Sequence, residues 1–373
     1  MFSAQILSEL AGRGQEIEAI SPITSAALQG GDAFGRAHPE LHITRFELPY
    51  LASGPDIPPS QEYREHERGL IRELVEQAVA RSRPDVLIAG REAIVPQLED
   101  LDCISGLPRM LVSHGTTMFG IERGTYPREL AEPLLAAMRR FDLIVTSGRH
   151  ARTAMAELGV PGVRVIPNPV DLQRFRPLEP DATMLRELAI PAGAVVVLHA
   201  SKLTEQKRPM DLLGAAERVL AENDRFVFVV AGEGRLREEV ERACHSRGLG
   251  ADFRFPGWIE YERMPELMSV GDMVVMPSAY ECQALVYLET MACARPLIAS
   301  DIVAAREVVD DGVNGLLHPE GDEERLAELI VACATDRPLV KRLTERGLES
   351  AAQHALPLIT DSYEQALTGL ARV

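Results

Sequence analysis

The sequence predicts an α/β protein of two doubly wound domains, and three observations support this prediction. Short apolar runs alternate with amphipathic stretches about ten times along the chain, which is typical of parallel strands joined by helices. Most of these runs are continuous Val, Ile and Leu rather than alternating, as in strands buried on both faces. The length of 373 residues exceeds one ordinary domain and suits two.

The predicted strands fall into two sets, one in each half of the chain. In chain order, the strand segments are 17–20, 86–89, 109–113, 143–146, 163–166, 195–199, 226–231, 253–255, 273–276 and 297–299. Helical patterns lie between them at 62–83, 209–221, 235–247 and 323–333. The segment 21–60 is rich in Gly and Pro and poorly patterned, so we expect mostly loops there.

A proline-rich segment separates the two strand sets. The stretch IPNPVDLQRFRPLEPD (166–181) ends the first set, and such a segment between two α/β blocks suits an interdomain linker. We therefore expect one domain over 1–170 and a second over 171–354.

The composition excludes several classes of protein. A net charge of −17 provides no general attraction to nucleic acid or to an anionic membrane. The N-terminus lacks the pattern of a signal peptide, and the longest apolar runs are too short to span a bilayer. Five scattered cysteines without a Cys-x-x-Cys pair predict reduced thiols and a cytoplasmic location. No metal-ligand spacing is visible, so we expect neither a metal nor a cofactor.

Two turns of the second domain carry residues suited to phosphate. Lys202 and Lys207 follow the strand at 195–199, where two cations and a helix N-terminus suit a diphosphate. The alternative is two solvated lysines on a loop. Gly232 and Gly234 follow the strand at 226–231 and permit close backbone approach, although a lone Gly-x-Gly fits a structural turn equally well.

The stretch PSAYECQALVYLE follows the strand at 273–276. Glu281 stands just before a helix that we expect to begin near Gln283, and Glu289 lies about two turns inside it. Carboxylates accept hydrogen bonds from vicinal hydroxyls, and free amides at a helix start hold phosphate. The alternatives are favourable placement of Glu281 at a positive helix end and an ordinary surface position for Glu289. Together with the lysines, a phosphate-plus-sugar site is the better account.

One residue of the first domain is a further candidate for ligand contact. His114 follows the strand at 109–113 and precedes Gly115. A residue at the carboxyl end of a parallel strand is placed to meet a ligand. The alternative is a hydrogen-bonded structural histidine.

These motifs together resemble the retaining glycosyltransferases of family four, which have the GT-B fold of two Rossmann-like domains facing a central cleft. The spacing Glu281-x7-Glu289 within PSAYECQALVYLETMACARPLIAS resembles the family signature. IPNPVD (166–171) resembles its linker, and SKLTEQK (201–207) resembles its phosphate loop. VVAGEGRLREEVERA and REVVDDGVNGLLHPEGDEERLAELI also follow in the family's order, and the similarity extends over residues 85–350.

The resemblance implies a role for each matching residue. Glu289 would bind the nucleotide ribose, and Glu281 the hydroxyls of the donor sugar. Lys202 and Lys207 would neutralise the leaving diphosphate, and His114 would lie near the reacting sugar carbon. The other donor-binding positions that the resemblance implies, including the base pocket and the amides of the helix start, are Gly232, Trp258, Ile259, Gln283, Ala284, Leu285 and Val286.

The implied activity is a hexosyltransferase reaction with retention, independent of metal and cofactor. The donor would be a UDP- or GDP-sugar bound by 171–354, and 1–170 would bind a sugar or small-molecule acceptor. The C-terminal helix, 355–373, would return to the first domain. Nucleic acid is not an expected partner, and the absence of a basic amphipathic helix argues against membrane association.

The sequence departs from the family pattern at three places. Lys202 replaces an arginine, and Cys282-Gln283-Ala284 replaces Gly-Phe-Gly. The family's first strand and its Gly-Gly loop are expected upstream of Met1. The alternatives are a non-catalytic or truncated sugar-nucleotide-binding protein, and an epimerase or phosphorylase of the same fold.

Overall fold

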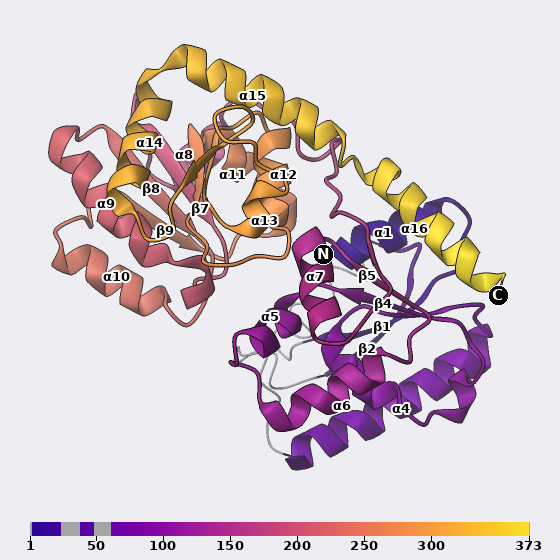
Figure 1. Ribbon diagram of the computed structural model, residues 1–373. Helices are drawn as coiled ribbons and strands as arrows, with labels where there is room; N and C mark the ends of the chain where they lie inside the picture. The colour runs from indigo at the N-terminus through magenta and orange to yellow at the C-terminus, as the bar shows by residue number, and fades with distance from the viewer. Residues whose placement is uncertain (1, 24–37, 48–60, 373) are drawn as a thin grey trace. The chain divides into compact units, whose positions relative to one another are not determined.

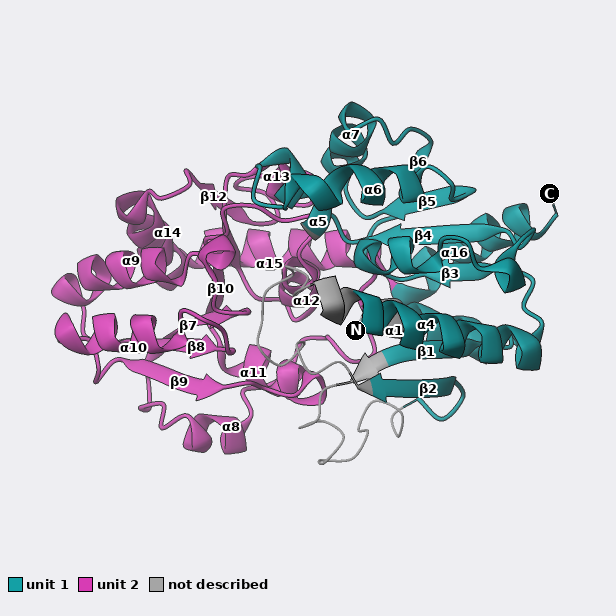
Figure 2. Ribbon diagram, turned by 90° about the horizontal axis from the view of Figure 1, so that it is seen from below, with its two compact units in different colours: residues 1–168, 356–373 teal, residues 169–355 magenta. Residues whose placement is uncertain are grey.

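The computed structural model describes residues 2–23, 38–47 and 61–372, which form an alternating series of helices and strands (Figure 1). The chain divides into two compact units (Figure 2). Unit 1 comprises 1–168 together with 356–373, and unit 2 comprises 169–355. This division lies next to the expected boundaries, and the donor and acceptor roles of the two units stay predictions.

Unit 2 is built on one sheet of six parallel strands in the order β12-β11-β10-β7-β8-β9. Its strands are β7 (Val195–Ala200), β8 (Phe226–Ala231), β9 (Phe253–Gly257), β10 (Met273–Met276), β11 (Leu297–Ser300) and β12 (Leu316–His318). Every residue of β8 and β10 is buried. The expectation that continuous apolar runs form parallel strands covered on both faces is therefore confirmed.

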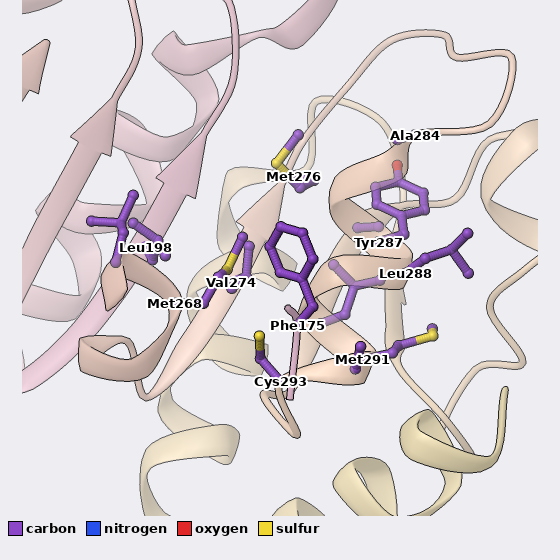
Figure 3. Packing of buried hydrophobic residues seen from close by; sticks show 14 of the residues in the cluster. Phe175, Leu198, Met268, Val274, Met276, Ala284, Tyr287, Leu288, Met291 and Cys293 are labelled. Carbon is purple, nitrogen blue, oxygen red and sulfur yellow. The ribbon is translucent and has the colours of Figure 1, made fainter. Parts of the chain in front are cut away.

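Successive residues of each strand supply two separate cores, because their side chains point to opposite faces of the sheet. Val274 packs on the face with Tyr287 and Phe175 (Figure 3), whereas Val275 packs on the other face with Leu212. The helices of unit 2 are α8 (Ala182–Glu187), α9 (Pro209–Glu222), α10 (Arg237–Ser246), α11 (Met264–Val270), α12 (Leu285–Ala292), α13 (Val303–Arg306), α14 (Glu323–Thr335) and α15 (Arg337–Ala352).

The described part of unit 1 contains two parallel sheets that share one core. β1 (Glu18–Ile23) pairs with β2 (His42–Glu47), and β3 (Leu87–Ala89), β4 (Arg109–Ser113), β5 (Leu143–Thr146) and β6 (Val163–Val165) pair in chain order. Phe46 of the first sheet and Leu111 of the second are buried in the same cluster. The helices of unit 1 are α1 (Phe2–Gly12), α4 (Gln61–Ser82), α5 (Thr116–Glu122), α6 (Arg128–Met138), α7 (Arg149–Glu157) and α16 (Leu356–Ala371).

Charged contacts attach the C-terminal helix α16 to α1 within unit 1. The Arg13 guanidinium donates to Asp361 at 2.6 Å and to Glu364 at 3.0 Å. The same side chain donates to the carbonyl oxygen of Pro357 at 3.1 Å. No helix within 2–23, 38–47 and 61–372 combines the length and the hydropathy that crossing a bilayer requires.

The structure corrects three details of the sequence interpretation. The expectation of loops over 21–60 is wrong for β2 and for the end of β1, and the rest of that segment, 24–37 and 48–60, lies outside the described residues. β12 was not predicted, because its three residues LLH are too few to show a pattern. The helix expected to begin near Gln283 begins at Leu285, with Ala284 as its N-cap residue.

Candidate functional site

The turns that follow β7 and β10 meet at one end of the sheet in unit 2. These two strands are hydrogen-bonded neighbours, so their carboxyl ends lie side by side. The amide of Ala279 donates to the carbonyl of Gln206 at 2.8 Å, and the Gln206 side chain donates to the carbonyl of Tyr280 at 2.9 Å. Residues 201–207, which carry Lys202 and Lys207 and are called the lysine turn below, are thus joined by backbone and side-chain hydrogen bonds to the stretch that carries Glu281.

Lys207 and Glu281 form an ion pair at this junction. The Lys207 ammonium donates to Oε1 of Glu281, and the Ser278 hydroxyl donates to the same oxygen at 2.8 Å. The Glu281 side chain is 7% exposed and that of Lys207 is 18% exposed. Burying a carboxylate is costly unless it is paired, and this carboxylate has both a cation and a hydroxyl. The tertiary structure therefore brings together one of the two candidate lysines and the first candidate glutamate.

His199 forms a hydrogen bond with the lysine turn, and the sequence interpretation did not include it among the candidate site residues. The imidazole is fully buried at the end of β7. Its Nδ1 donates to the carbonyl of Val275 at 2.9 Å, and its Nε2 accepts from the Ser201 hydroxyl at 2.7 Å. Burial lowers the pKa of His199 to about 4, and the charge of Lys207 acts in the same direction. The only sequence signal was a histidine inside the apolar strand VVVLHA.

Gly232 and Gly234 form a turn that packs against the lysine turn. Their φ angles are 132° and 157°, in the region that favours glycine. A Cβ atom on Gly232 would lie 1.9 Å from the carbonyl oxygen of Ser201, and one on Gly234 would lie 2.2 Å from that of Leu203. The two glycines therefore have a structural reason to be present, and ligand contact by Gly232 stays a prediction.

The N-terminal turn of α12 faces the same end of the sheet as Glu281. Its N-cap residue, Ala284, carries no side-chain oxygen, so the first amides, including those of Leu285 and Val286, require partners from outside the helix. Ala284 is buried, whereas Gln283, Leu285 and Val286 are half-buried. Free amides at a helix start suit an anion, and phosphate binding by this one stays a prediction.

Glu289 is a buried carboxylate, so its interpretation as an ordinary helix-surface residue is wrong. Its side chain lies in α12 and is 7% exposed. The Tyr261 hydroxyl donates a hydrogen bond to it, but burial is the larger effect and raises the pKa of Glu289 to about 7. The Arg174 guanidinium lies 4.9 Å from the centre of the Tyr261 ring. An acidic group that titrates near neutral pH is typical of functional sites.

The remaining candidates of unit 2 lie closer to solvent. Lys202 is exposed, in contrast to the half-buried Lys207. Trp258 follows β9 and is 59% exposed, whereas Ile259 is half-buried. The amide of Gly232 donates to the carbonyl of Gly257 at 2.8 Å, which joins the Trp258 segment to the glycine turn.

His114 of unit 1 lies after β4, beside a buried carboxylate that the sequence interpretation missed. Glu92, at the start of the 3₁₀ helix η2 (Glu92–Leu98), is 4% exposed and binds the residues on both sides of His114. Burial lowers the pKa of His114, and the nearby charge of Glu92 opposes that effect. The only sequence signal for Glu92 was its position shortly after the strand predicted at 86–89.

Across the three described ranges, no three His, Cys, Asp or Glu side chains lie together in a group that could hold a metal ion.

Comparisons with protein families match nearly the whole chain in two segments. Residues 2–174 match the family described as Glycosyltransferase Family 4. Residues 181–350 match the family described as Glycosyl transferases group 1. The resemblance inferred from the motifs is confirmed, and the two matches meet at the predicted linker.

Curated relatives share moderate sequence identity with this chain. Lipopolysaccharide core biosynthesis glycosyltransferase LpsE of Rhizobium meliloti is 29% identical over 304 residues, which cover 81% of each chain. The 2-deoxystreptamine N-acetyl-D-glucosaminyltransferase of Streptomyces fradiae is 30% identical over 62% of this chain and 57% of its own length. Alpha-D-kanosaminyltransferase of Streptomyces kanamyceticus is 28% identical over 47% of this chain and 43% of its own. The chain thus spans about half the length of the latter two relatives.

Solved structures match the fold over most of the chain. The crystal structure of Anabaena HepE in complex with UDP and glucose gives a TM-score of 0.77 at 18% identity, covering 95% of this chain and 100% of the other. Sucrose-phosphate synthase of Thermosynechococcus elongatus gives 0.75 at 19% identity, covering 95% and 99%. The predicted fold class, GT-B with Rossmann-like units, is confirmed.

Proposed function

Because the chain belongs to the group 1 glycosyltransferase family, we propose that it transfers a sugar from a nucleotide-sugar donor to an acceptor. The observation that carries the proposal is the contact between Lys207 and Glu281. It brings a cation for phosphate and an acceptor for sugar hydroxyls to adjacent strand ends, where one activated sugar can meet both.

The diphosphate of the donor is assigned to Lys207, Lys202 and the amides around Gln283 to Val286. Two cations and a helix N-terminus favour an anion through charge and through directed N–H groups. The half-buried position of Lys207 supports its role, because a charge acts more strongly where water is partly excluded. Lys202, being exposed, would contribute less.

The two glutamates are assigned to the hydroxyls of the donor. Glu289 would bind the ribose diol, and its raised pKa of about 7 supports this role, because hydroxyl donors would stabilise an otherwise poorly solvated carboxylate. Glu281 would bind the transferred sugar. Trp258 and Ile259 are assigned to the nucleobase, and His114 to the reacting sugar carbon.

We propose that transfer proceeds with retention and without a metal ion. The bond from the anomeric carbon to the diphosphate breaks, and the lysines and helix amides stabilise the charge that develops on the leaving group. The acceptor oxygen forms the new bond to the anomeric carbon on the face that the diphosphate leaves, and the departing phosphate takes the proton of the acceptor hydroxyl. No protein nucleophile is assigned. UDP-sugars are the first donors to test, since HepE was solved with UDP and glucose, and the acceptor is a sugar or small molecule.

Binding of UDP tests the donor site directly. The chain has a single tryptophan, so its fluorescence reports on the Trp258 segment alone. We expect UDP to bind by calorimetry and to quench this fluorescence. Glu289→Ala should raise the Kd about tenfold to a hundredfold, the effect of losing hydrogen bonds to a charged group. Glu239→Ala, an exposed position on α10, is the matched control. Equal affinity for UDP in the unchanged protein, Glu289→Ala and Glu239→Ala would contradict the assigned site.

Turnover separates the enzyme from a binding protein. A panel of UDP- and GDP-sugars with sugar acceptors should identify a pair that releases nucleoside diphosphate, and NMR of the product should show the anomeric configuration of the donor. Release of the nucleoside diphosphate should continue in the presence of EDTA, because no metal ion takes part in the proposed reaction. Tight binding of a nucleotide sugar with no release from any pair would favour the non-catalytic alternative.

A further inference from the structure

Glu92 binds both neighbours of His114 through one oxygen atom. Its Oε1 accepts a hydrogen bond from the Ser113 hydroxyl at 2.5 Å and another from the amide of Gly115 at 3.1 Å. The Gly115 amide also lies 3.2 Å from the Ser113 hydroxyl, so the three groups form one cluster. The carboxylate, at 4% exposure, and Ser113, at 1%, are both buried.

The β3–η2 turn also holds His114 itself. The imidazole makes a hydrogen bond with the backbone of Gly90, two residues before Glu92. The backbone after His114 turns sharply, because Gly115 adopts φ 77° as the N-cap residue of α5. One short segment, 90–92, therefore binds three consecutive residues of the β4–α5 turn.

A carboxylate is a costly choice for packing alone. Removing it from water costs several kcal/mol unless it is well paired, and an apolar side chain of similar volume often stabilises a core better. What a carboxylate provides here is a strong acceptor for two donors and a fixed negative charge near an imidazole. Neither property is needed to fill the core of unit 1.

We propose that Glu92 is the positioning residue of His114, holding the turn in which it lies and placing a negative charge beside its imidazole. The catalytic meaning of this arrangement depends on the proposed function, in which His114 meets the reacting sugar carbon. The physical link between the two residues does not depend on it, so the two ideas can fail separately.

The charges around His114 predict the direction in which its pKa changes when the charge of Glu92 is removed. Burial lowers the pKa of His114, Arg91 acts in the same direction, and Glu92 and the Gly90 hydrogen bond oppose them. Removing the charge of Glu92 should therefore move the pKa of His114 further down. A residue that acted only through packing would not produce this shift.

The first experiment follows the titration of His114 by NMR, with the imidazole signal assigned by its loss in His114→Gln. Glu92→Gln keeps the size and one acceptor oxygen but removes the charge. Asp142→Asn is the matched control, because Asp142 also binds a backbone amide of β4, that of Arg109 at 2.7 Å, but at the opposite end of the strand. The His114 midpoint should fall in Glu92→Gln and stay unchanged in Asp142→Asn. An unchanged midpoint in folded Glu92→Gln overturns the proposal.

The second experiment measures transfer kinetics. Glu92→Gln should lower kcat by about tenfold to a hundredfold with the donor KM unchanged, the effect of a displaced catalytic group. When Glu92→Gln is added to His114→Gln, kcat should fall little below that of His114→Gln alone, because the two residues act as a unit. A full additional loss in the double variant means that Glu92 acts elsewhere and overturns the proposal. If no donor supports transfer, the proposed function fails, whereas the NMR titration still decides the link.

Discussion

Lys207 and Glu281 form an ion pair between the ends of two neighbouring parallel strands, although 74 positions separate them in the chain. Ser278 adds a hydroxyl to the same carboxylate oxygen. Glu281 and the Gln206 side chain hold the lysine turn at the end of β7, where we propose that a diphosphate binds. Such prior ordering favours electrostatic stabilisation of a leaving group, because little reorganisation is required during the reaction.

The ion pair predicts a cost of removing either partner alone. Lys207→Met leaves the buried carboxylate of Glu281 with the Ser278 hydroxyl, and we expect the free energy of unfolding to fall by about 2–3 kcal/mol, somewhat less than for a fully buried pair. Adding Glu281→Gln should restore part of that loss. Urea denaturation measures both. Lys341→Met, from the exposed pair with Glu345, is the control and should cost almost nothing; equal losses from the two lysine variants would count against a buried pair.

The raised pKa of Glu289 predicts a pH-dependent affinity for UDP. With a pKa of about 7, this carboxyl is mostly protonated at pH 6 and must lose its proton before both of its oxygens can accept from the two ribose hydroxyls. The Kd should therefore rise as the pH falls below about 7, approaching tenfold per pH unit. Calorimetry with Glu289→Gln provides the control, because both proteins share the titration of the UDP phosphate itself. Parallel pH profiles for the two proteins would exclude Glu289 as the titrating group.

Two buried groups predict opposite effects of pH on stability. Burial lowers the pKa of His199 from 6.5 to about 4, so the unfolded state binds the proton first, and acidification from pH 6.5 to 4 should cost about 3 kcal/mol. Burial raises the pKa of Glu289 from 4.5 to about 7, so its protonation favours the folded state, and acidification from pH 7 to 4.5 should restore a similar amount.

Unfolding titrations of single variants separate these two effects. In Glu289→Gln the remaining histidine effect should make the free energy of unfolding fall more steeply on acidification than in the unchanged protein. In His199→Gln the free energy should fall less steeply, or rise. Identical slopes in all three proteins would show that neither group carries the expected shift.

The glycine turn predicts position-specific costs of an added methyl group. Gly232→Ala and Gly234→Ala place a Cβ against carbonyl oxygens at 1.9 and 2.2 Å, so backbone must move. We expect a loss of several kcal/mol by thermal or urea unfolding, of the order seen for strained or overpacked sites. Gly193→Ala is the control, because Gly193 also has a positive φ, 76°, but open space around its Cβ position. Its cost should stay near 1 kcal/mol, and a comparable loss at all three positions would mean that the collision with the lysine turn is unimportant.

Much of the fold follows from local pattern. The runs FVFVVA and MVVM contain only apolar side chains, and such runs bounded by turns are most stable as strands buried between two layers of helices. β2 gave no comparable signal, because HITRFE is two-thirds polar and buries Phe46 against residues distant in the chain. Strand pairing itself depends on contacts between distant segments, so only the folded protein reveals that the described strands of unit 1 form two sheets rather than one.

The residue types of the candidate site and their positions after strands are properties of the sequence, and they sufficed to predict the lysine turn, the two glutamates and the family. Burial, pairing and titration are decided by tertiary structure. Neighbours far away in the chain decide which lysine pairs with Glu281 and how deeply Glu289 is buried. They also decide where His199 and Glu92 lie. The physical reason is that the energy of a charge is determined by the solvent it loses and the partners it gains, and both are defined only when distant segments pack together.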